Sequence, residues 1–517
     1  MGQEEAERGL RFARGRGRAA AGADSADPSA ASGSVDDDSE ELGEKYALSA
    51  AAKKSRSAEE AVAYARVHAW TEAGDAAFAA LSKIGQLLSV GAFAAVVSEL
   101  LHHDDPVVRR RSIAMFNSHV SAKVEQLSRA EAQLYLHLLE DLLPMVRDRE
   151  ESQETRQTAL LAVEVLARNF AKDFPVAFRP ALEAAAETVD ASASRVGDEL
   201  RAAACVCVQA MASNMGTMVI GHLGRVVPAL LNAAERSLPG SDTNASEKAA
   251  ASDSEDGDDA GRVLLLRCSL AAVSVLLEQF PQFMPAFIGR VLAVSCHPAV
   301  VSPPAGALDL AFGDALAGAI EAGSSGAGLQ GRLLKDVRAR RVLASTQRKL
   351  EGSMARRVPS RALLPALLTA IARSKSQTMA PVTLCGFLSA MSAALEHGRR
   401  VEINALAQKV SDTMLQLLDN RWQAAVDSPA DRTKQSREST FIDRQVGEAL
   451  GALVLRVSDD RARAIVTQLL EWGNAPLDEL NEACKKSGSS DKDQSLFASI
   501  SRRTSMYTAL SAIMRAG

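Results

Sequence analysis

Residues 104–116 read DDPVVRRRSIAMF, and this stretch decides the fold because it holds the signals of a helix start. Asp104 or Asp105 can accept a hydrogen bond from the free N–H groups of a first helical turn, and Pro106 suits the first helical position. Ile113 and Phe116 then continue an apolar stripe at helical spacing. The stretch therefore predicts a helix that begins near Pro106 and buries one face.

Patterns of the same kind lie on both sides of this stretch. Upstream, apolar residues recur every three or four positions in two adjacent segments, 78–88 and 93–101, which predict a helical hairpin. Downstream, the segments 134–143 and 160–170 repeat the pattern, and prolines follow the second of them. The predicted buried stripe of the first upstream helix consists of Phe78, Leu81, Ile84, Leu87 and Leu88.

Helix pairs that recur at intervals of about 40 residues are typical of HEAT or armadillo units. Aromatic residues make up 4% of the chain, and Ala, Leu and Val supply most of its apolar content, which favours helix packing over β-sheet. We therefore predict an all-α, HEAT/armadillo-like α-solenoid, an α-α superhelix, with a disordered N-terminal tail and an acidic loop insertion.

Four regions follow from changes in composition. Residues 1–45 combine Arg14-Gly15-Arg16-Gly17-Arg18 with small residues and an acidic run, and they are predicted to form a disordered tail that touches RNA, serves as an import signal or is simply solvated. Residues 46–237 and 262–517 are predicted to hold HEAT-like helical repeats. Between them, residues 238–261 are predicted to form an acidic disordered loop. Its Ser252 and Ser254 are flanked by acids, and they are either phosphorylation sites or plain solvated residues.

Charge and cysteine content bear on partners and compartment. The net charge is −5, so any contact with RNA has to come from a local patch. The 6 cysteines lie mostly in apolar helical patterns, which fits a reducing compartment. The N-terminus carries Glu4, Glu5 and Glu7 instead of an apolar segment, and no uninterrupted apolar run is as long as a membrane span, so we expect a soluble intracellular protein.

Three short motifs have residue types that could do chemistry, but their context favours a structural role. Gly326, Gly328 and Gly331 form G-x-G-x-x-G without a preceding strand, which favours a linker. The segment 102–105 reads HHDD, which favours a helix cap over a metal site. Cys205 and Cys207 lie in an Ala/Val-rich helix and are expected in the core. We predict no catalytic, cofactor-binding or metal-binding residues and no enzyme activity.

A basic segment is the strongest candidate for a binding site. Residues 331–361 contain ten basic residues against only Asp336 and Glu351, a local charge of +8. Arg338, Arg341, Arg348 and Lys349 have helical spacings that could form one basic stripe suited to phosphate contact without base reading. The alternative is an ordinary solvated helix face.

Five segments, in order, resemble the C-terminal part of the HEAT repeat-containing protein 1 family, nucleolar scaffolds of the small-subunit processome. They are residues 104–120, 154–182, 266–292, 343–371 and 441–473, of which the last ends in Leu469-Leu470-Glu471-Trp472-Gly473. The resemblance covers roughly residues 80–515. Members of the family are far longer, and the resemblance supplies no individual ligand residues.

The resemblance implies a nuclear, nucleolar protein that supports pre-18S rRNA processing and transcription of ribosomal DNA. The implied partners are other processome subunits, pre-rRNA and box C/D small nucleolar RNA, held directly or through proteins, with no membrane and no small-molecule substrate. Two alternatives share the fold: an importin-like transport solenoid and a phosphatase-type scaffold subunit. The three tryptophans form no repeated Trp/Asn ladder, which disfavours the importin reading.

Overall fold

The computed structural model describes residues 65–66, 68–123, 127–191, 196–238, 255–301, 337–373, 381–427, 432–475 and 489–516. The chain divides into two compact units, residues 1–79 and 80–517, which are considered separately. In the first unit the structure describes residues 65–66 and 68–79, which are helical. The indole of Trp70 is exposed.

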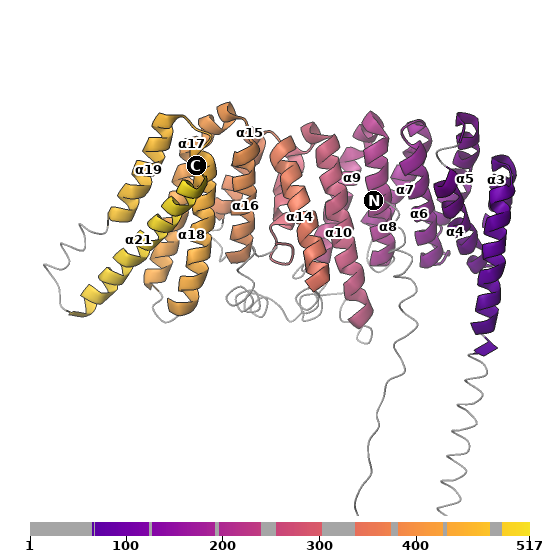
Figure 1. Cartoon of the computed structure of the whole chain (residues 1–517), viewed down its shortest axis with the longest axis horizontal. Coiled ribbons are helices and arrows are strands. Elements are labelled where there is room, and N and C mark those ends of the chain that lie inside the picture. Colours follow the sequence, from indigo (N-terminus) through magenta and orange to yellow (C-terminus); the bar gives the residue numbers. More distant parts are fainter. Residues whose placement is uncertain are drawn as a thin grey trace, which may run out of the picture. The chain divides into compact units, whose positions relative to one another are not determined.

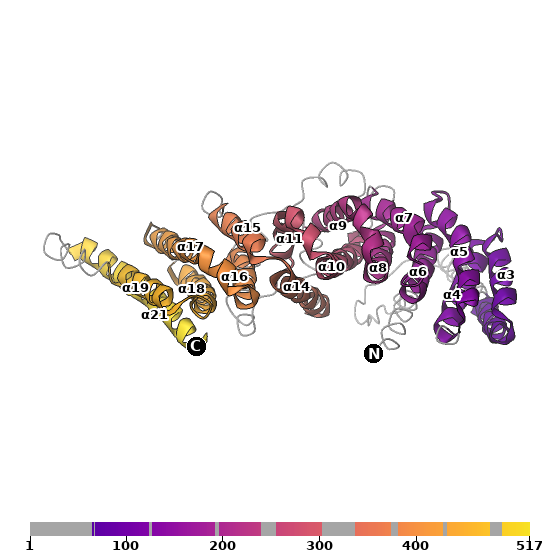
Figure 2. The ribbon, with the colours of Figure 1, turned by 90° about the horizontal axis from the view of Figure 1, so that it is seen from above.

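The second unit is built from helices that pack in two layers (Figures 1 and 2). Layer A contains α3 (Val90–Leu101), α5 (Arg129–Arg147), α7 (Arg179–Asp190), α9 (Leu223–Ser237), α11 (Ile288–Ser295), α15 (Ser360–Arg373), α17 (Arg400–Asp427) and α19 (Asp459–Asn474). Layer B contains α4 (Pro106–Lys123), α6 (Gln153–Phe170), α8 (Asp198–Asn214), α10 (Glu255–Gln279), α14 (Val337–Arg357), α16 (Pro381–His397), α18 (Arg432–Val454) and α21 (Ser489–Ala516). Within each layer a helix packs on the helices before and after it, and no strand occurs among the described residues.

The start of α4 confirms the prediction from the 104–116 stretch. The helix begins at Pro106, and a side-chain oxygen of Asp105 accepts a hydrogen bond from the backbone N–H of Val107 at 2.8 Å. Ile113 and Phe116 are buried in the core, as their spacing predicts. The next helix begins with a capping box, in which Ser128 and Glu131 satisfy each other's backbone N–H groups.

Arginines that are buried or half-buried mark the beginning of successive layer B helices. Arg109 donates to the carbonyl of His103 at 2.6 Å, and Arg156 donates to the carbonyl of Val146 at 3.0 Å. Arg201, which is 1% exposed, reaches Asp198 at 3.3 Å. Because each of these residues lies in the first or second turn of α4, α6 or α8, they identify a structural repeat that sequence identity does not reveal.

The core continues from one helix pair to the next, with small residues at the closest approaches. A Cβ added to Gly447 of α18 would lie 2.7 Å from the Cα of Ala509 in α21. The two helices can approach each other this closely because Gly447 has no side chain and Ala509, which faces it, has a small one. The observed helices, layers and continuous core confirm the predicted all-α, HEAT/armadillo-like solenoid.

Three details differ from the expectations. Leu81, Ile84 and Leu87 are exposed instead of buried, because among the described residues no helix covers that face of the first hairpin. The helix α10 begins at Glu255, earlier than the apolar pattern suggests. The segment Ala260–Gln279 also has the length and mean hydropathy of a membrane span, at 1.8, although none was expected. It packs between α8 and α14, and 61% of the span is buried, as in a core helix of a helical array.

Candidate nucleic-acid interface

The predicted basic stripe lies on α14, in layer B between α10 and α16. One side of α14 is held in the core by Leu343, Leu350 and Met354, which are buried. A polar contact also holds this side of α14 against α10: the hydroxyl of Ser353 donates to Glu278 of α10 at 2.7 Å. The opposite side of α14 faces solvent and carries the basic residues.

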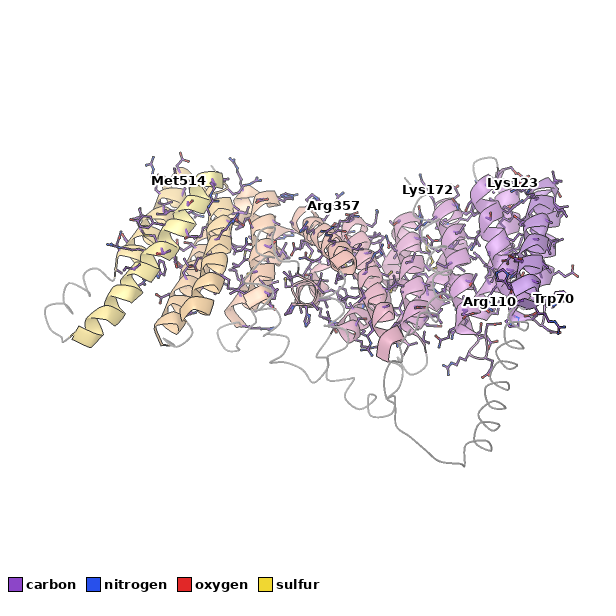
Figure 3. All side chains as sticks on the ribbon, turned by 60° about the horizontal axis from the view of Figure 1, so that its bottom comes forward. Trp70, Arg110, Lys123, Lys172, Arg357 and Met514 are labelled. Carbon is purple, nitrogen blue, oxygen red and sulfur yellow. The ribbon has the colours of Figure 1, made fainter. Side chains whose placement is uncertain are left out.

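The structure places most of the predicted site residues together on this solvent side. Arg341, Arg348 and Lys349 are all exposed. Arg338 lies on the first turn of α14, and its side chain is outside the described part. Arg356 and Arg357 extend the exposed basic surface to the end of the helix, where Arg357 is labelled in Figure 3. We use the name basic stripe for Arg341, Arg348, Lys349 and Arg356.

Small residues occupy the middle of the basic stripe, between its two edges. At 3.6 residues per turn, Ser345 and Gly352 lie between one edge formed by Arg341 and Arg348 and another formed by Lys349 and Arg356. The guanidinium of Arg356 folds back over Gly352, so that a Cβ added there would meet its Nη1 atom at 3.2 Å. Basic groups therefore border a shallow track along the helix.

Arg356 was not among the predicted stripe residues. It lies eight residues after Arg348 and seven after Lys349, which is two helical turns, so this spacing was the signal that could have included it.

The charge of the stripe is not neutralised by close carboxylates. In the described part of the chain, no carboxylate oxygen lies within 4.0 Å of the charged nitrogens of the four stripe residues. Glu351, one of the two acidic residues in segment 331–361, does not lie beside the stripe but points into the core. Its side chain accepts a hydrogen bond from Gln347, and the hydroxyl of Ser389 lies 3.5 Å from its other oxygen.

Burial makes Glu351 a weak counter-charge. Desolvation raises its pKa to about 7, and only part of this effect is opposed by the hydrogen bond from Ser389 and by the nearby charge of Arg348. Near neutral pH this carboxyl group is therefore protonated for a substantial part of the time. The described face of α14 keeps a net positive charge that the count of acids in the sequence understates.

The surroundings of the stripe lack stacking surfaces. The described residues of α10, α14 and α16 include no exposed Phe, Tyr or Trp. Instead, Leu264 and Arg267 are exposed on α10, and Ser389 and Ala393 are partly exposed on α16. Such a surface can hold phosphates or carboxylates by charge, but it offers no ring for a base to stack on.

The other motifs occupy structural positions or lie outside the described residues. Cys205 and Cys207 are buried in α8, where desolvation raises the pKa of both thiols, that of Cys205 to about 12. Among the described residues no group of three or more His, Cys, Asp or Glu side chains could hold a metal ion. The G-x-G-x-x-G segment, Ser252 and Ser254 fall outside the described residues.

Paired helices in two layers, joined by one continuous core and presenting a charged helix face, define a helical-repeat scaffold of the HEAT type. Comparison with known proteins agrees with this class. The chain is similar to HEAT repeat-containing protein 1. The human protein of that name is 23% identical over 422 residues, which is 80% of this chain and 17% of the human protein.

Other relatives carry the same name. The homolog from Dictyostelium discoideum is 26% identical over 223 residues, 43% of this chain and 9% of that protein. The protein from Danio rerio is 29% identical over 164 residues, 29% of this chain. The chain thus spans less than a fifth of the length of these curated relatives, and no protein-family model matches it.

Solved structures with a similar arrangement include the karyopherin Kap121p and importin beta. A crystal structure of a Kap121p mutant has a TM-score of 0.42 at 12% identity, covering 85% of this chain and 44% of that one. A structure of importin beta has a TM-score of 0.28 at 10% identity, covering 86% of this chain and 66% of that one. At these values the likeness concerns the helical architecture alone.

Proposed function

We propose that this chain is a non-catalytic scaffold in the assembly of the small ribosomal subunit, acting in the nucleolus as part of the small-subunit processome. In this role it supports processing of pre-18S rRNA and transcription of ribosomal DNA. Its partners are other processome subunits together with pre-rRNA and box C/D small nucleolar RNA. The α14 face is the part of the described surface through which the chain meets a phosphate-bearing partner.

The single observation that carries the proposal is the basic stripe on a helix of a two-layer array. Arg341, Arg348, Lys349 and Arg356 are exposed, and the described residues provide them with no close carboxylate. A cluster of basic groups with no close carboxylate can attract an anionic partner even though the net charge of the whole chain is −5. The resemblance to HEAT repeat-containing protein 1 supports the choice of ribosome assembly over the other roles of helical scaffolds.

Affinity capture of the tagged full-length chain from nuclear extract, with and without ribonuclease, tests the proposal. We expect processome proteins and pre-18S RNA to co-purify and the tagged protein to be enriched in nucleoli. Ribonuclease-resistant recovery of processome proteins would identify direct protein contacts. Recovery of transport cargo or of a phosphatase in place of processome subunits would contradict the proposal and favour one of the two alternative scaffold functions.

A further inference from the structure

We propose that the basic stripe of α14 binds the phosphate backbone of double-stranded RNA, by charge and shape and without reading bases. The inference rests on the proposed function, because it names the partner of the same surface. Three features of the surface support it: the placement of the basic groups, the small residues between them and the kinds of side chain on the neighbouring helices.

The basic groups form two short rows along one helix. Arg341 and Arg348 are seven residues apart on one edge, and Lys349 and Arg356 are seven residues apart on the other. At a rise of 1.5 Å per residue, each pair spans about 10.5 Å along the axis. Two parallel rows of cations can meet phosphates on either side of a groove, whereas a single row can follow only one strand.

The track between the rows allows close approach. Ser345 and Gly352 present no bulky side chain of their own, so a sugar-phosphate backbone that approaches the track meets the basic groups before any other side chain. The guanidinium of Arg356 already lies across Gly352, where nothing larger than hydrogen separates it from the helix backbone. Three of the four basic groups are arginines, whose planar donors suit phosphate oxygens.

The neighbouring helices favour a duplex over a single strand. Proteins that hold single-stranded RNA stack its bases mainly on aromatic side chains, with arginine guanidinium planes as a second platform. In the described residues of α10, α14 and α16, no Phe, Tyr or Trp is exposed. In a duplex the bases are already stacked on each other, and proteins recognise it through phosphates, 2′-hydroxyl groups and the shape of the groove. An acidic protein segment could also be attracted by charge, but it would not need the paired rows.

The test is fluorescence anisotropy with the full chain and two labelled probes, an RNA duplex of about 16 base pairs and one of its strands alone. The stripe variant combines Arg341→Gln, Arg348→Gln, Lys349→Gln and Arg356→Gln. A matched control removes four exposed charges from other places, with Lys83→Gln, Lys172→Gln, Lys409→Gln and Arg463→Gln. A third variant, with Arg14→Ala, Arg16→Ala and Arg18→Ala, removes the three arginines of the Arg/Gly stretch in the N-terminal tail.

We expect the wild-type chain to bind the duplex more tightly than the single strand, and the stripe variant to lose about tenfold or more in affinity at low salt. Between about 50 and 200 mM salt, the slope of log K against log salt should fall by about one for each lost phosphate contact. The control and the tail variant should keep most of the affinity. Circular dichroism should show the wild-type helix content for the stripe variant and the control, because their altered side chains are exposed.

Three results would overturn the inference: equal losses in the stripe variant and the control, loss of duplex binding only in the tail variant, or tighter binding of the single strand. Displacement of the duplex by polyglutamate at a comparable concentration of charge would likewise identify the site as one for acidic protein segments. The proposed function has a separate test, whatever the result for duplex binding: it is contradicted if the wild-type chain captures no processome proteins. A stripe variant that still captures these proteins after ribonuclease treatment but has lost duplex binding would support both.

Discussion

The guanidinium of Arg502 lies over the indole ring of Trp472, 4.7 Å from the ring centroid, and both side chains bond the same oxygen of Asp419. Nε1 of Trp472 donates at 3.1 Å and Nη2 of Arg502 at 2.9 Å. Since these residues lie on α17, α19 and α21, one carboxylate oxygen joins three helices. This junction adds a polar contact with α17 and α19 to the packing of α21 on α18.

Replacing Asp419 by Ala should weaken this junction. The change removes the shared acceptor of the indole N–H and the Arg502 guanidinium, and because the Asp419 side chain is half exposed it should cost about 1 kcal/mol of local stability. Hydrogen exchange of the α21 amides is the measurement, because one helix of a repeat array can open locally. Leu470→Ala, on the exposed side of α19, is the control. Equal exchange rates of the α21 amides in both variants would show that Asp419 does not stabilise the packing of α21.

Replacing Gly447 by Ala should destabilise the contact between α18 and α21. The new Cβ would lie 2.7 Å from the Cα of Ala509 and 2.9 Å from the Cβ of Ala512, so the helices would have to move apart, at a cost of about 1 to 3 kcal/mol.

Gly289 offers a matched control for this substitution, because a Cβ added there meets nothing within 4 Å. Gly289→Ala in α11 should raise stability by up to about 1 kcal/mol, since alanine costs less chain entropy than glycine in a helix. Urea unfolding followed by circular dichroism measures both changes. A loss of stability in both variants would show that the close approach of α18 and α21 is not the cause.

Replacing Glu351 by Gln should change how stability depends on pH. Burial raises the pKa of Glu351 from 4.5 to about 7, so the folded state holds this proton more tightly than the unfolded state. The resulting contribution to stability is complete below pH 4.5 and is lost as pH rises through 7. Because one pKa unit corresponds to about 1.4 kcal/mol, the variant should be more stable than wild type at pH 8 by up to about 3 kcal/mol.

Thermal unfolding between pH 5 and pH 8 tests this expectation. The difference between Glu351→Gln and wild type should grow with pH. Glu396→Gln, which alters an exposed carboxylate at the end of α16, should run parallel to wild type. A constant difference between Glu351→Gln and wild type over this range would show that the buried carboxyl group does not titrate there.

Replacing Tyr135 by Phe should cost about 1 kcal/mol. The Tyr135 hydroxyl lies 2.9 Å from Nδ1 of His119, which stacks on Phe93 at a centroid distance of 3.7 Å. Both residues are buried, so the lost hydroxyl leaves a buried nitrogen without its partner. Urea unfolding gives the change in stability. A variant as stable as wild type would mean that the hydrogen bond contributes nothing net.

The sequence predicts where a helix begins and which residues share one of its faces better than it predicts which neighbouring helix covers that face. The start of α4 and the burial of Ile113 and Phe116 follow from local rules of capping and periodicity. Periodicity also predicts which positions share a face of α14, and Arg341, Arg348 and Lys349 are exposed together as expected.

Periodicity does not determine which face meets a neighbour. The apolar stripe at Leu81 and Leu87 is exposed, because burial depends on a helix that local pattern cannot supply. The position of Glu351 in the core has the same explanation, since Ser389, which contacts it, lies 38 residues away on α16. The junction of Asp419, Trp472 and Arg502 depends on three distant segments and has no local signal in the sequence.

The neighbour-to-neighbour packing of layers A and B has a mechanical consequence. No described helix of the second unit is held by the whole array, so a small rotation at any one interface meets resistance only from the helices beside it. Rotations at successive interfaces add, and the array behaves as a spring whose stiffness is that of its interfaces in series. A ligand that stiffened α14 against its neighbours would therefore change the compliance of the chain between proteins bound on either side of it.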